Sequence, residues 1–152
     1  MLFDFDFRHC TARDAMFRAC RFFGVARFLH AEFVRQAQFD GAEFFGAAWF
    51  EAAKFGNDAW FGGARFSTIA DFRRATFERR AAFGRNSWLG AAEFSGRVNF
   101  SETSFDRRPE LSGVRAAEAA AASGIQQWPV GWTTVTNTED AQWLIVEAGD
   151  RN

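Results

Sequence analysis

The chain has little of the chemistry that marks several large classes of protein. Among its 152 residues are two cysteines, two histidines and no tyrosine. Two cysteines cannot build a disulfide framework, and the few histidines and cysteines give no metal-ligand spacing. No apolar run approaches about 18 residues and no charged-then-apolar leader is present, so we expect neither a membrane span nor a signal peptide.

An excess of charge of one sign is also lacking. The chain has 18 basic and 19 acidic residues, which gives a formal net charge of −1. A balanced surface favours neither direct nucleic-acid binding nor the behaviour of a strongly acidic rod. We therefore expect a cytoplasmic protein with reduced thiols that binds neither nucleic acid nor membranes directly.

Phenylalanine is abundant instead, with 21 residues, and it recurs periodically. From Ala26 to Phe83 a small residue, a variable residue and a Phe repeat at spacings that alternate between five and six residues. We call the Phe the centre of each unit and the small residue two positions earlier its anchor. Extended both ways, the pattern gives 20 units between Phe5 and about Gly113, 17 of them centred on Phe. The other centres are Ala12, Leu89 and Leu111. Such self-similarity decides the fold.

An α-helix cannot bury this pattern. Within eleven residues the apolar offsets are 0, 2, 5 and 7. At about 100° per residue they spread around the whole helix, so no single face would be apolar. In extended backbone, positions two apart point the same way, so anchor and centre both face inward. The residues between them are mostly polar, as an outward position requires: Arg27, Glu32, Gln38, Glu43, Lys54, Arg65, Asp71 and Glu93.

Each unit therefore predicts a very short strand followed by a corner. Glycines after several centres suit corners that need a positive φ: Gly41, Gly46, Gly62, Gly63, Gly84 and Gly96. Repeating the unit winds a solenoid in which each Phe is buried only against the neighbouring coils.

The pattern resembles that of the pentapeptide-repeat proteins, in the subgroup where five- and six-residue units alternate. The resemblance covers roughly residues 5 to 113. It implies an all-β fold, a right-handed parallel quadrilateral β-helix of about five coils with four units per coil. A coil here would take about 22 residues and not 20, so we expect looser corners on two of the four sides.

The solenoid is expected to span residues 1–113, and residues 114–152 to form a C-terminal capping segment. The Ala-rich stretch 115–123 predicts a short helix, and residues 132–147 predict a β-hairpin. Trp128, Trp132 and Trp143 would cover the last coil.

One irregularity interrupts the alternation at 75–89. The units that begin at Ala75 and Ala81 are both six residues long, and the next has a Ser87 anchor and a Leu89 centre. We interpret this as a local bulge, a corner with one extra residue; a functional kink is the alternative.

No residue set predicts catalysis, a metal site or a cofactor, so we expect a protein that is not an enzyme. His9 and His30 each follow a centre by two residues, four units apart, so they should lie one above the other. Two imidazoles alone make a poor metal site. Cys10 and Cys20 occupy anchors on opposite walls and should be buried.

A candidate interaction surface is more informative. Phe23 and Phe45 follow their centres directly, one coil apart, so both should point outward, with Arg21 and Glu43 adjoining them. Stacked exposed Phe side chains suggest a contact surface; the alternative is that a loop or the C-terminal segment covers them. Three further outward aromatics stand on different walls: Trp49, Trp60 and Trp88.

The function predicted first is a rigid, non-enzymatic protein-interaction scaffold. Its partner is another protein, or a second copy bound through a solenoid end or the Phe23–Phe45 wall. The family resemblance implies an alternative, because some pentapeptide-repeat proteins mimic B-form DNA, bind DNA gyrase and protect it from inhibitors. That function needs an acidic rod, yet one expected wall mixes both signs: Asp6, Arg27, Trp49, Asp71 and Glu93.

Overall fold

Short strands and turns make up the part of the chain that the computed structural model describes. The described residues are 3–84, 90–117, 126–137, 139–140 and 143–149. Within these ranges all regular structure is β, and no helix is long and apolar enough to cross a membrane. The prediction of an all-β parallel solenoid of about five turns is confirmed.

Two opposite walls, A and C, carry the five-residue units. The strands of wall A are β1 (Phe5–Asp6), β5 (Ala26–Arg27), β9 (Ala48–Trp49), β13 (Ala70–Asp71), β17 (Val98–Asn99) and β20 (Gln126–Gln127). The strands of wall C are β3 (Ala15–Met16), β7 (Ala37–Gln38), β11 (Ala59–Trp60) and β15 (Ala81–Ala82). All of these strands pair in parallel with the strands of the neighbouring coils.

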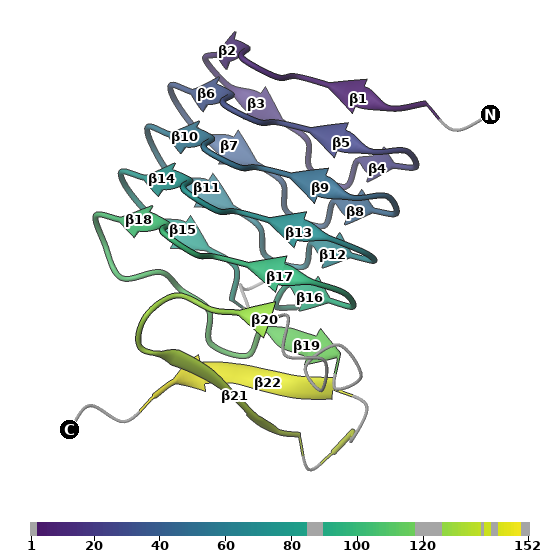
Figure 1. Cartoon of the computed structure of the whole chain (residues 1–152), viewed down its shortest axis with the longest axis vertical. Coiled ribbons are helices and arrows are strands. Elements are labelled where there is room, and N and C mark those ends of the chain that lie inside the picture. The colour runs from purple at the N-terminus through teal and green to yellow at the C-terminus, as the bar shows by residue number, and fades with distance from the viewer. Residues whose placement is uncertain (1–2, 85–89, 118–125, 138, 141–142, 150–152) are drawn as a thin grey trace.

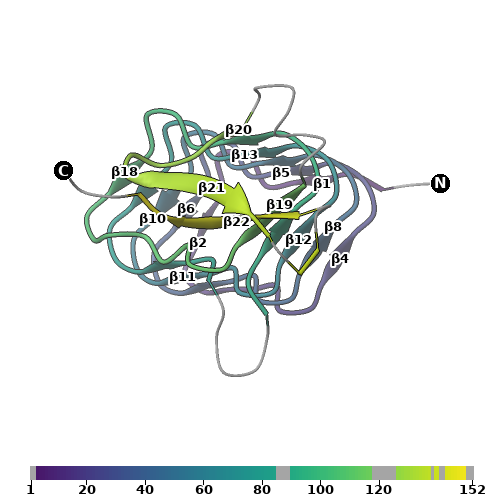
Figure 2. The same ribbon diagram turned by 90° about the horizontal axis from the view of Figure 1, so that it is seen from below.

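The other two walls, B and D, carry the six-residue units. The strands of wall B are β2 (Thr11–Ala12), β6 (Glu32–Phe33), β10 (Lys54–Phe55), β14 (Thr76–Phe77) and β18 (Ser104–Phe105). The strands of wall D are β4 (Arg21–Phe22), β8 (Glu43–Phe44), β12 (Arg65–Phe66), β16 (Glu93–Phe94) and β19 (Arg115–Ala117). Wall D continues into an antiparallel hairpin of β21 (Trp132–Thr136) and β22 (Trp143–Ala148). Figure 1 shows the coils stacked one upon another, and Figure 2 shows the hairpin lying across the C-terminal end.

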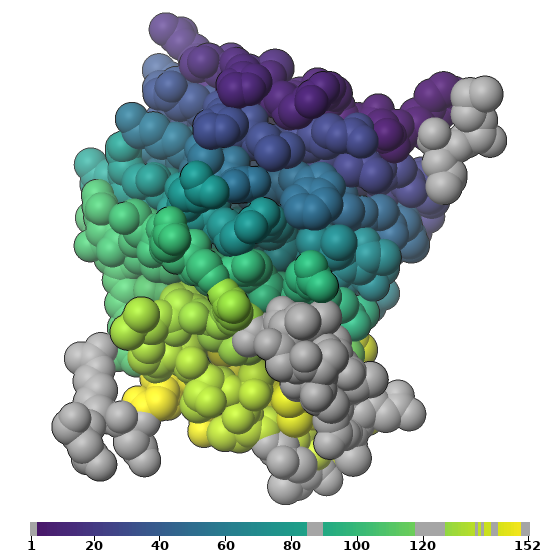
Figure 3. Space-filling view, viewed as in Figure 1, coloured from purple at the N-terminus to yellow at the C-terminus, as the bar shows by residue number. Residues whose placement is uncertain are grey.

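The interior consists of Phe rings stacked in columns along the axis. Phe50 stacks on Phe72 of the next coil with ring centroids 4.9 Å apart and planes within 3°. It meets Phe39 of a neighbouring column edge to face, at 5.4 Å and 89°. Anchors such as Ala48 are fully buried beside the rings, because a methyl group leaves the columns room to touch. Both geometries are favourable for aromatic pairs, so the alternation of Ala and Phe encodes the packing. In the space-filling view of Figure 3 the successive coils, from purple to green, lie in contact over the face shown.

The corners after walls A and C are tight turns that need a left-handed residue. In these turns, except the one after Phe83, the third residue after a centre donates its N–H back to that centre, as Ala31 does to the Phe28 carbonyl at 3.0 Å. The second residue has a positive φ. Glycine takes this place at 41, 63 and 113, but six side-chain-bearing residues also take it: His9, Ala19, His30, Ala52, Arg74 and Glu102.

Two other predicted corner glycines have a different purpose from the one predicted. Gly46 and Gly96 do not adopt a positive φ. A Cβ at Gly46 would lie 2.5 Å from the carbonyl oxygen of Gly24, and one at Gly96 would lie 2.3 Å from that of Thr68. In these looser corners glycine is therefore required for the close approach of successive coils.

The bulge expected near Leu89 is larger than one residue. Ala26 pairs with Ala48, a spacing of 22 residues, whereas Phe66 pairs with Phe94, a spacing of 28. The ladder of wall D passes directly from β12 to β16, so six extra residues enter between walls C and D. The predicted unit centred on Leu89 has no strand in this ladder, and residues 85–89, including Trp88, lie outside the described residues. The prediction of a one-residue bulge followed by a unit centred on Leu89 was therefore wrong.

The helix predicted at 115–123 is not supported. Arg115–Ala117 form β19, which pairs in parallel with β16 on one side and antiparallel with β22 on the other. Val114 and Ala116 are buried at alternate positions, the period of a strand. Two ladders and this burial outweigh the helix propensity of alanine. The rest of the predicted helix, residues 118–125, lies outside the described residues.

Candidate interaction surface

Phe23 and Phe45 form a stacked pair of exposed aromatic rings. Each follows a strand of wall D, where the chain turns toward wall A. Their ring centroids are 5.1 Å apart with planes within 3° of parallel, and the residues are 50% and 40% exposed. The next position in this column is Ser67, so the aromatic surface ends after two coils. No described segment covers the pair.

A ladder of alternating charge runs along wall D beside the two rings. Arg21 lies 3.5 Å from Glu43, and Arg65 lies 3.8 Å from Glu93 in the coils that follow. Arg115 extends the ladder, at 3.3 Å from Glu93. Arg21 and Glu43 lie in the strands that directly precede the two rings, and each charge is offset by its neighbour in the stack.

The other predicted aromatics do not join this surface. Trp49 lies on wall A, where it pairs in register with Arg27 and Asp71. Trp60 lies on wall C, with the Arg80 guanidinium 5.2 Å from its ring centroid. The two tryptophans are thus separate features on opposite walls, and Trp88 lies outside the described residues.

The repeat itself decides what kind of protein this is. Residues 39–85 match the family described as pentapeptide repeats (9 copies), and the same ladder extends on both sides of that segment. The matched segment is a run of pentapeptide repeats. Comparisons with curated proteins and with solved structures found no significant match.

Wall A of this pentapeptide-repeat solenoid mixes charge, but not with the residues expected. The outward column reads Asp6, Arg27, Trp49, Asp71 and Asn99. Asn99 replaces the predicted Glu93 because the six extra residues shift every later unit by one wall. Asp71 is nearly fully buried and accepts bonds from Arg73 Nε at 2.9 and 3.0 Å.

The Asp6 carboxylate on the same wall is held ionised by its neighbour. Arg8 donates its Nε and one terminal nitrogen to the two carboxylate oxygens at 2.8 and 2.6 Å. The backbone N–H of Arg8 adds a bond at 3.1 Å. These bonds lower the pKa of Asp6 from 3.8 to about 2. The arrangement neutralises this end of wall A and brings no second acid or base to it.

The histidines of the pentapeptide-repeat solenoid stack as predicted. His9 and His30 have ring centroids 5.0 Å apart and planes within 5°. Among the described residues no three His, Cys, Asp or Glu side chains form a group that could hold a metal ion. Cys20 is partly buried, but Cys10 is exposed, contrary to prediction, because it lies in the first coil with no coil beyond it.

Sequence reasoning missed two surface features. Wall B begins with Ala12 where the later coils place Phe33 and its successors, so an apolar cavity of about 180 Å³ opens at the N-terminal end of that column. A groove of about 460 Å³ opens at the other end of the same wall. The Ala12 centre was a visible signal for the first feature. The second depends on where the hairpin leaves the coil, which the repeat does not encode.

Proposed function

We propose that this pentapeptide-repeat solenoid is a non-enzymatic scaffold that binds a protein through the Phe23–Phe45 pair. The observation that carries the proposal is the parallel stacking of two half-exposed rings on a wall that is otherwise polar. Contiguous exposed aromatic surface is typical of contact sites, and aromatic residues are frequent anchors of interfaces. The Arg21–Glu43 pair beside the rings would form the polar rim of such an interface.

The scaffold proposal includes the right-handed winding that the family resemblance implies. It also includes the absence of catalysis. Two features support that part. Phe28, Phe39 and Phe50 are among the rings that fill the interior completely, which leaves little room for a substrate inside the coils. The charged groups at the surface are mostly paired with opposite charges in the next coil, as Lys54 and Glu78 are at 3.3 Å.

Mimicry of DNA is the second function to consider, and the charge pattern disfavours it. A duplex mimic must offer rows of uncompensated negative charge to a basic groove. On wall D the signs alternate coil by coil from Arg21 through Glu93 to Arg115. We expect the purified protein to leave DNA gyrase supercoiling unchanged at micromolar concentration, and inhibition there would reverse the ranking of the two functions.

The test of the scaffold proposal replaces both rings by serine. Phe23→Ser with Phe45→Ser should weaken self-association in analytical ultracentrifugation, or the capture of a partner identified by affinity purification. The matched control is Val34→Ser, because Val34 is similarly exposed on wall B, at 45%. If the double variant and the wild type give identical sedimentation and capture profiles, the Phe pair is not an interface.

A further inference from the structure

Wall B ends at β18, where two backbone carbonyls accept no hydrogen bond from any described residue. In each lower coil the next rung donates two N–H groups to the anchor and centre carbonyls. Lys54 and Gly56 donate to Ala31 and Phe33 at 2.8 Å each. The corresponding carbonyls of the last rung belong to Thr103 and Phe105, and neither accepts a hydrogen bond within the described part of the chain. β18 is therefore an open parallel edge.

The chain does not continue wall B because it leaves the coil at this point. Trp128 still occupies a centre position, stacked on Phe100 at 6.0 Å. Gly131 then has a φ of +88°, and the chain enters β21, which pairs antiparallel with β22. The place of a sixth wall-B rung is thus left without a strand of the described chain.

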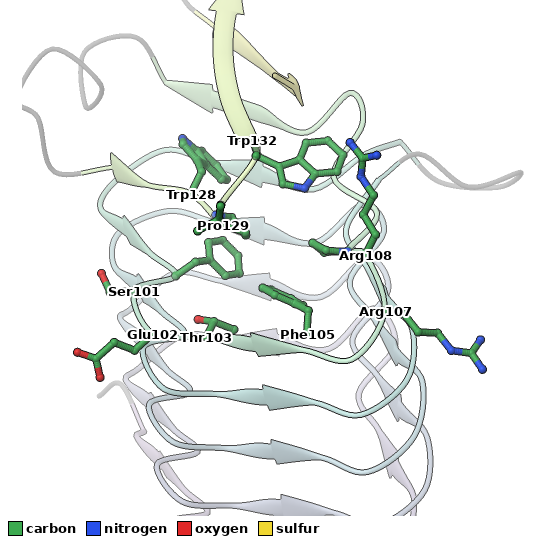
Figure 4. A pocket seen from close by; sticks show the side chains of 13 residues that line it. Ser101, Glu102, Thr103, Phe105, Arg107, Arg108, Trp128, Pro129 and Trp132 are labelled. Atoms are coloured by element: carbon green, nitrogen blue, oxygen red, sulfur yellow. The ribbon is translucent and has the colours of Figure 1, made fainter. Parts of the chain in front are cut away.

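A groove of about 460 Å³ occupies this place, a volume in the range of ordinary ligand sites. Figure 4 shows Phe105 and Thr103 on the β18 side and Trp128, Pro129 and Trp132 on the side of the departing chain. The column of rings along wall B ends here: Phe33, Phe55, Phe77 and Phe105 stack at 5.0, 4.5 and 5.1 Å. Phe105 is only partly buried, because no ring of the described residues stacks on its outer face to continue the column.

The two ends of the groove carry opposite charge. Arg107 and Arg108 line its end beyond the Phe105 ring, and no described carboxylate lies within salt-bridge distance of either. Glu102 lines the opposite end, 3.9 Å from Arg74. In the two coils below, the position three residues after the wall-B centre holds Asp58 and then Arg80, and the backbone N–H of Arg80 donates to Asp58 Oδ1 at 3.2 Å. Arg108 is the next residue in that column.

We propose that this groove binds an extended peptide of a partner protein by β-strand addition to β18. The peptide carries an aromatic residue, which stacks on Phe105, and an Asp or Glu three positions later, which pairs with Arg108. Its backbone N–H groups donate to the Thr103 and Phe105 carbonyls, as those of an additional rung would. This site lies on the wall opposite the Phe23–Phe45 pair and does not depend on that pair binding a protein.

The probe is the rung that the chain itself uses two coils earlier, Ala-Lys-Phe-Gly-Asn-Asp (residues 53–58), as a peptide with blocked ends. Added to the full chain, it should bind with a Kd of about 100 µM. Its titration should shift the backbone NMR signals of Thr103 and Phe105. Replacing the peptide glycine by sarcosine removes only the N–H that would meet the Phe105 carbonyl. That change should weaken binding about tenfold or more.

Charge reversal tests the orientation. Arg108→Glu should weaken binding of the peptide and restore it when the last Asp of the peptide is changed to Lys. The control is Arg79→Glu, an exposed arginine one coil below Arg107, which should leave binding unchanged. No binding at about 1 mM, or equal binding of the sarcosine peptide, would overturn the proposal. So would a dimer that Arg108→Glu dissociates while the peptide fails to bind, because a second copy would then be the occupant.

Discussion

The backbone N–H of Ala92 donates to the carbonyl oxygen of Phe83 at 2.8 Å, the bond that closes an ordinary tight corner. One coil earlier Ala64 makes the same bond to Phe61 at 3.0 Å. Two residues lie between Phe61 and Ala64, whereas eight lie between Phe83 and Ala92. The extra six residues thus enter within a single corner, and the stack resumes on the next wall as though they were absent.

Removing the insertion should therefore leave the solenoid intact. Deleting residues 85–89 together with Ala91 leaves Phe83-Gly84-Gly90-Ala92, the same four residue types as the corner at 61–64. A shorter closed loop costs less entropy, so we expect the free energy of unfolding to rise by about 1 kcal/mol. Urea denaturation followed by tryptophan fluorescence measures the change. A loss of cooperative unfolding would show that the inserted residues support the stack.

The ring columns should dominate stability. Phe50 is fully buried, between Phe28 at 4.8 Å and Phe72 at 4.9 Å. Phe50→Ala would open a cavity in the middle of the stack and should cost about 3–5 kcal/mol. Phe105→Ala, at the partly exposed end of a column, should cost less than half as much. Equal losses in chemical denaturation would contradict the column model.

The corner residues other than glycine that adopt a positive φ are strained, and substitution by glycine should relieve that strain. Ala52 has a φ of 58°, a conformation in which a Cβ costs roughly 1–2 kcal/mol. Ala52→Gly should stabilise the protein by about 0.5–1 kcal/mol, after the greater entropy of glycine in the unfolded chain is subtracted. Ala53→Gly is the control, because Ala53 is a buried anchor and its substitution should destabilise. Thermal unfolding of the two neighbouring variants gives opposite shifts in Tm if the account is right.

One carboxylate should make stability depend on pH. Burial raises the pKa of Asp40 above its ordinary 3.8, although Arg18 acts in the opposite direction. Between the ordinary pKa of 3.8 and the raised pKa of the folded state, the folded state holds more protons than the unfolded state, so stability falls as the pH rises through that interval. Asp40→Asn should be more stable than wild type at neutral pH, and the two should converge near about pH 3. Urea midpoints at several pH values measure this.

A second variant checks the cause of this pH dependence. Arg18 Nε lies 3.7 Å from the Asp40 carboxylate. Arg18→Gln removes the favourable charge and should enlarge the loss of stability between acid and neutral pH. If Asp40→Asn follows the wild-type curve at every pH, burial of this carboxyl has no energetic effect on folding.

The sequence was sufficient for the coil and its core because one residue type carries the register. The Phe centres every five or six residues fixed the inward positions, and the stacking of Phe23 on Phe45 and of His9 on His30 followed from counting four units per coil. The looser corners also followed, because the six-residue units had to belong to two opposite walls, B and D.

The prediction from the sequence was wrong where a short segment happened to match the repeat pattern. Ser87 and Leu89 match an anchor and a centre, but the ladder of wall D pairs Phe66 with Phe94 and passes over them. Only pairing between coils distinguishes an inserted segment from a degenerate unit. The helix prediction was wrong at Arg115–Ala117 for a related reason. Alanine favours a helix in isolation, but here these residues form a strand that pairs with a strand on each side. The open edge at β18 exists because the chain leaves the coil at Gly131. The periodicity of the sequence does not predict this departure.

The register across the insertion can be tested most directly by disulfide trapping. Ser67 and Ser95 follow the paired centres Phe66 and Phe94, so their Cα atoms should lie about 5 Å apart on adjacent rungs, within disulfide range. With Cys10 and Cys20 changed to serine, Ser67→Cys combined with Ser95→Cys should form an intramolecular disulfide rapidly and almost completely. Ser67→Cys combined with Leu89→Cys, the partner that an unbroken 22-residue repeat would supply, should stay reduced. Rapid disulfide formation in this second double variant, with the first double variant unreactive, would contradict the account.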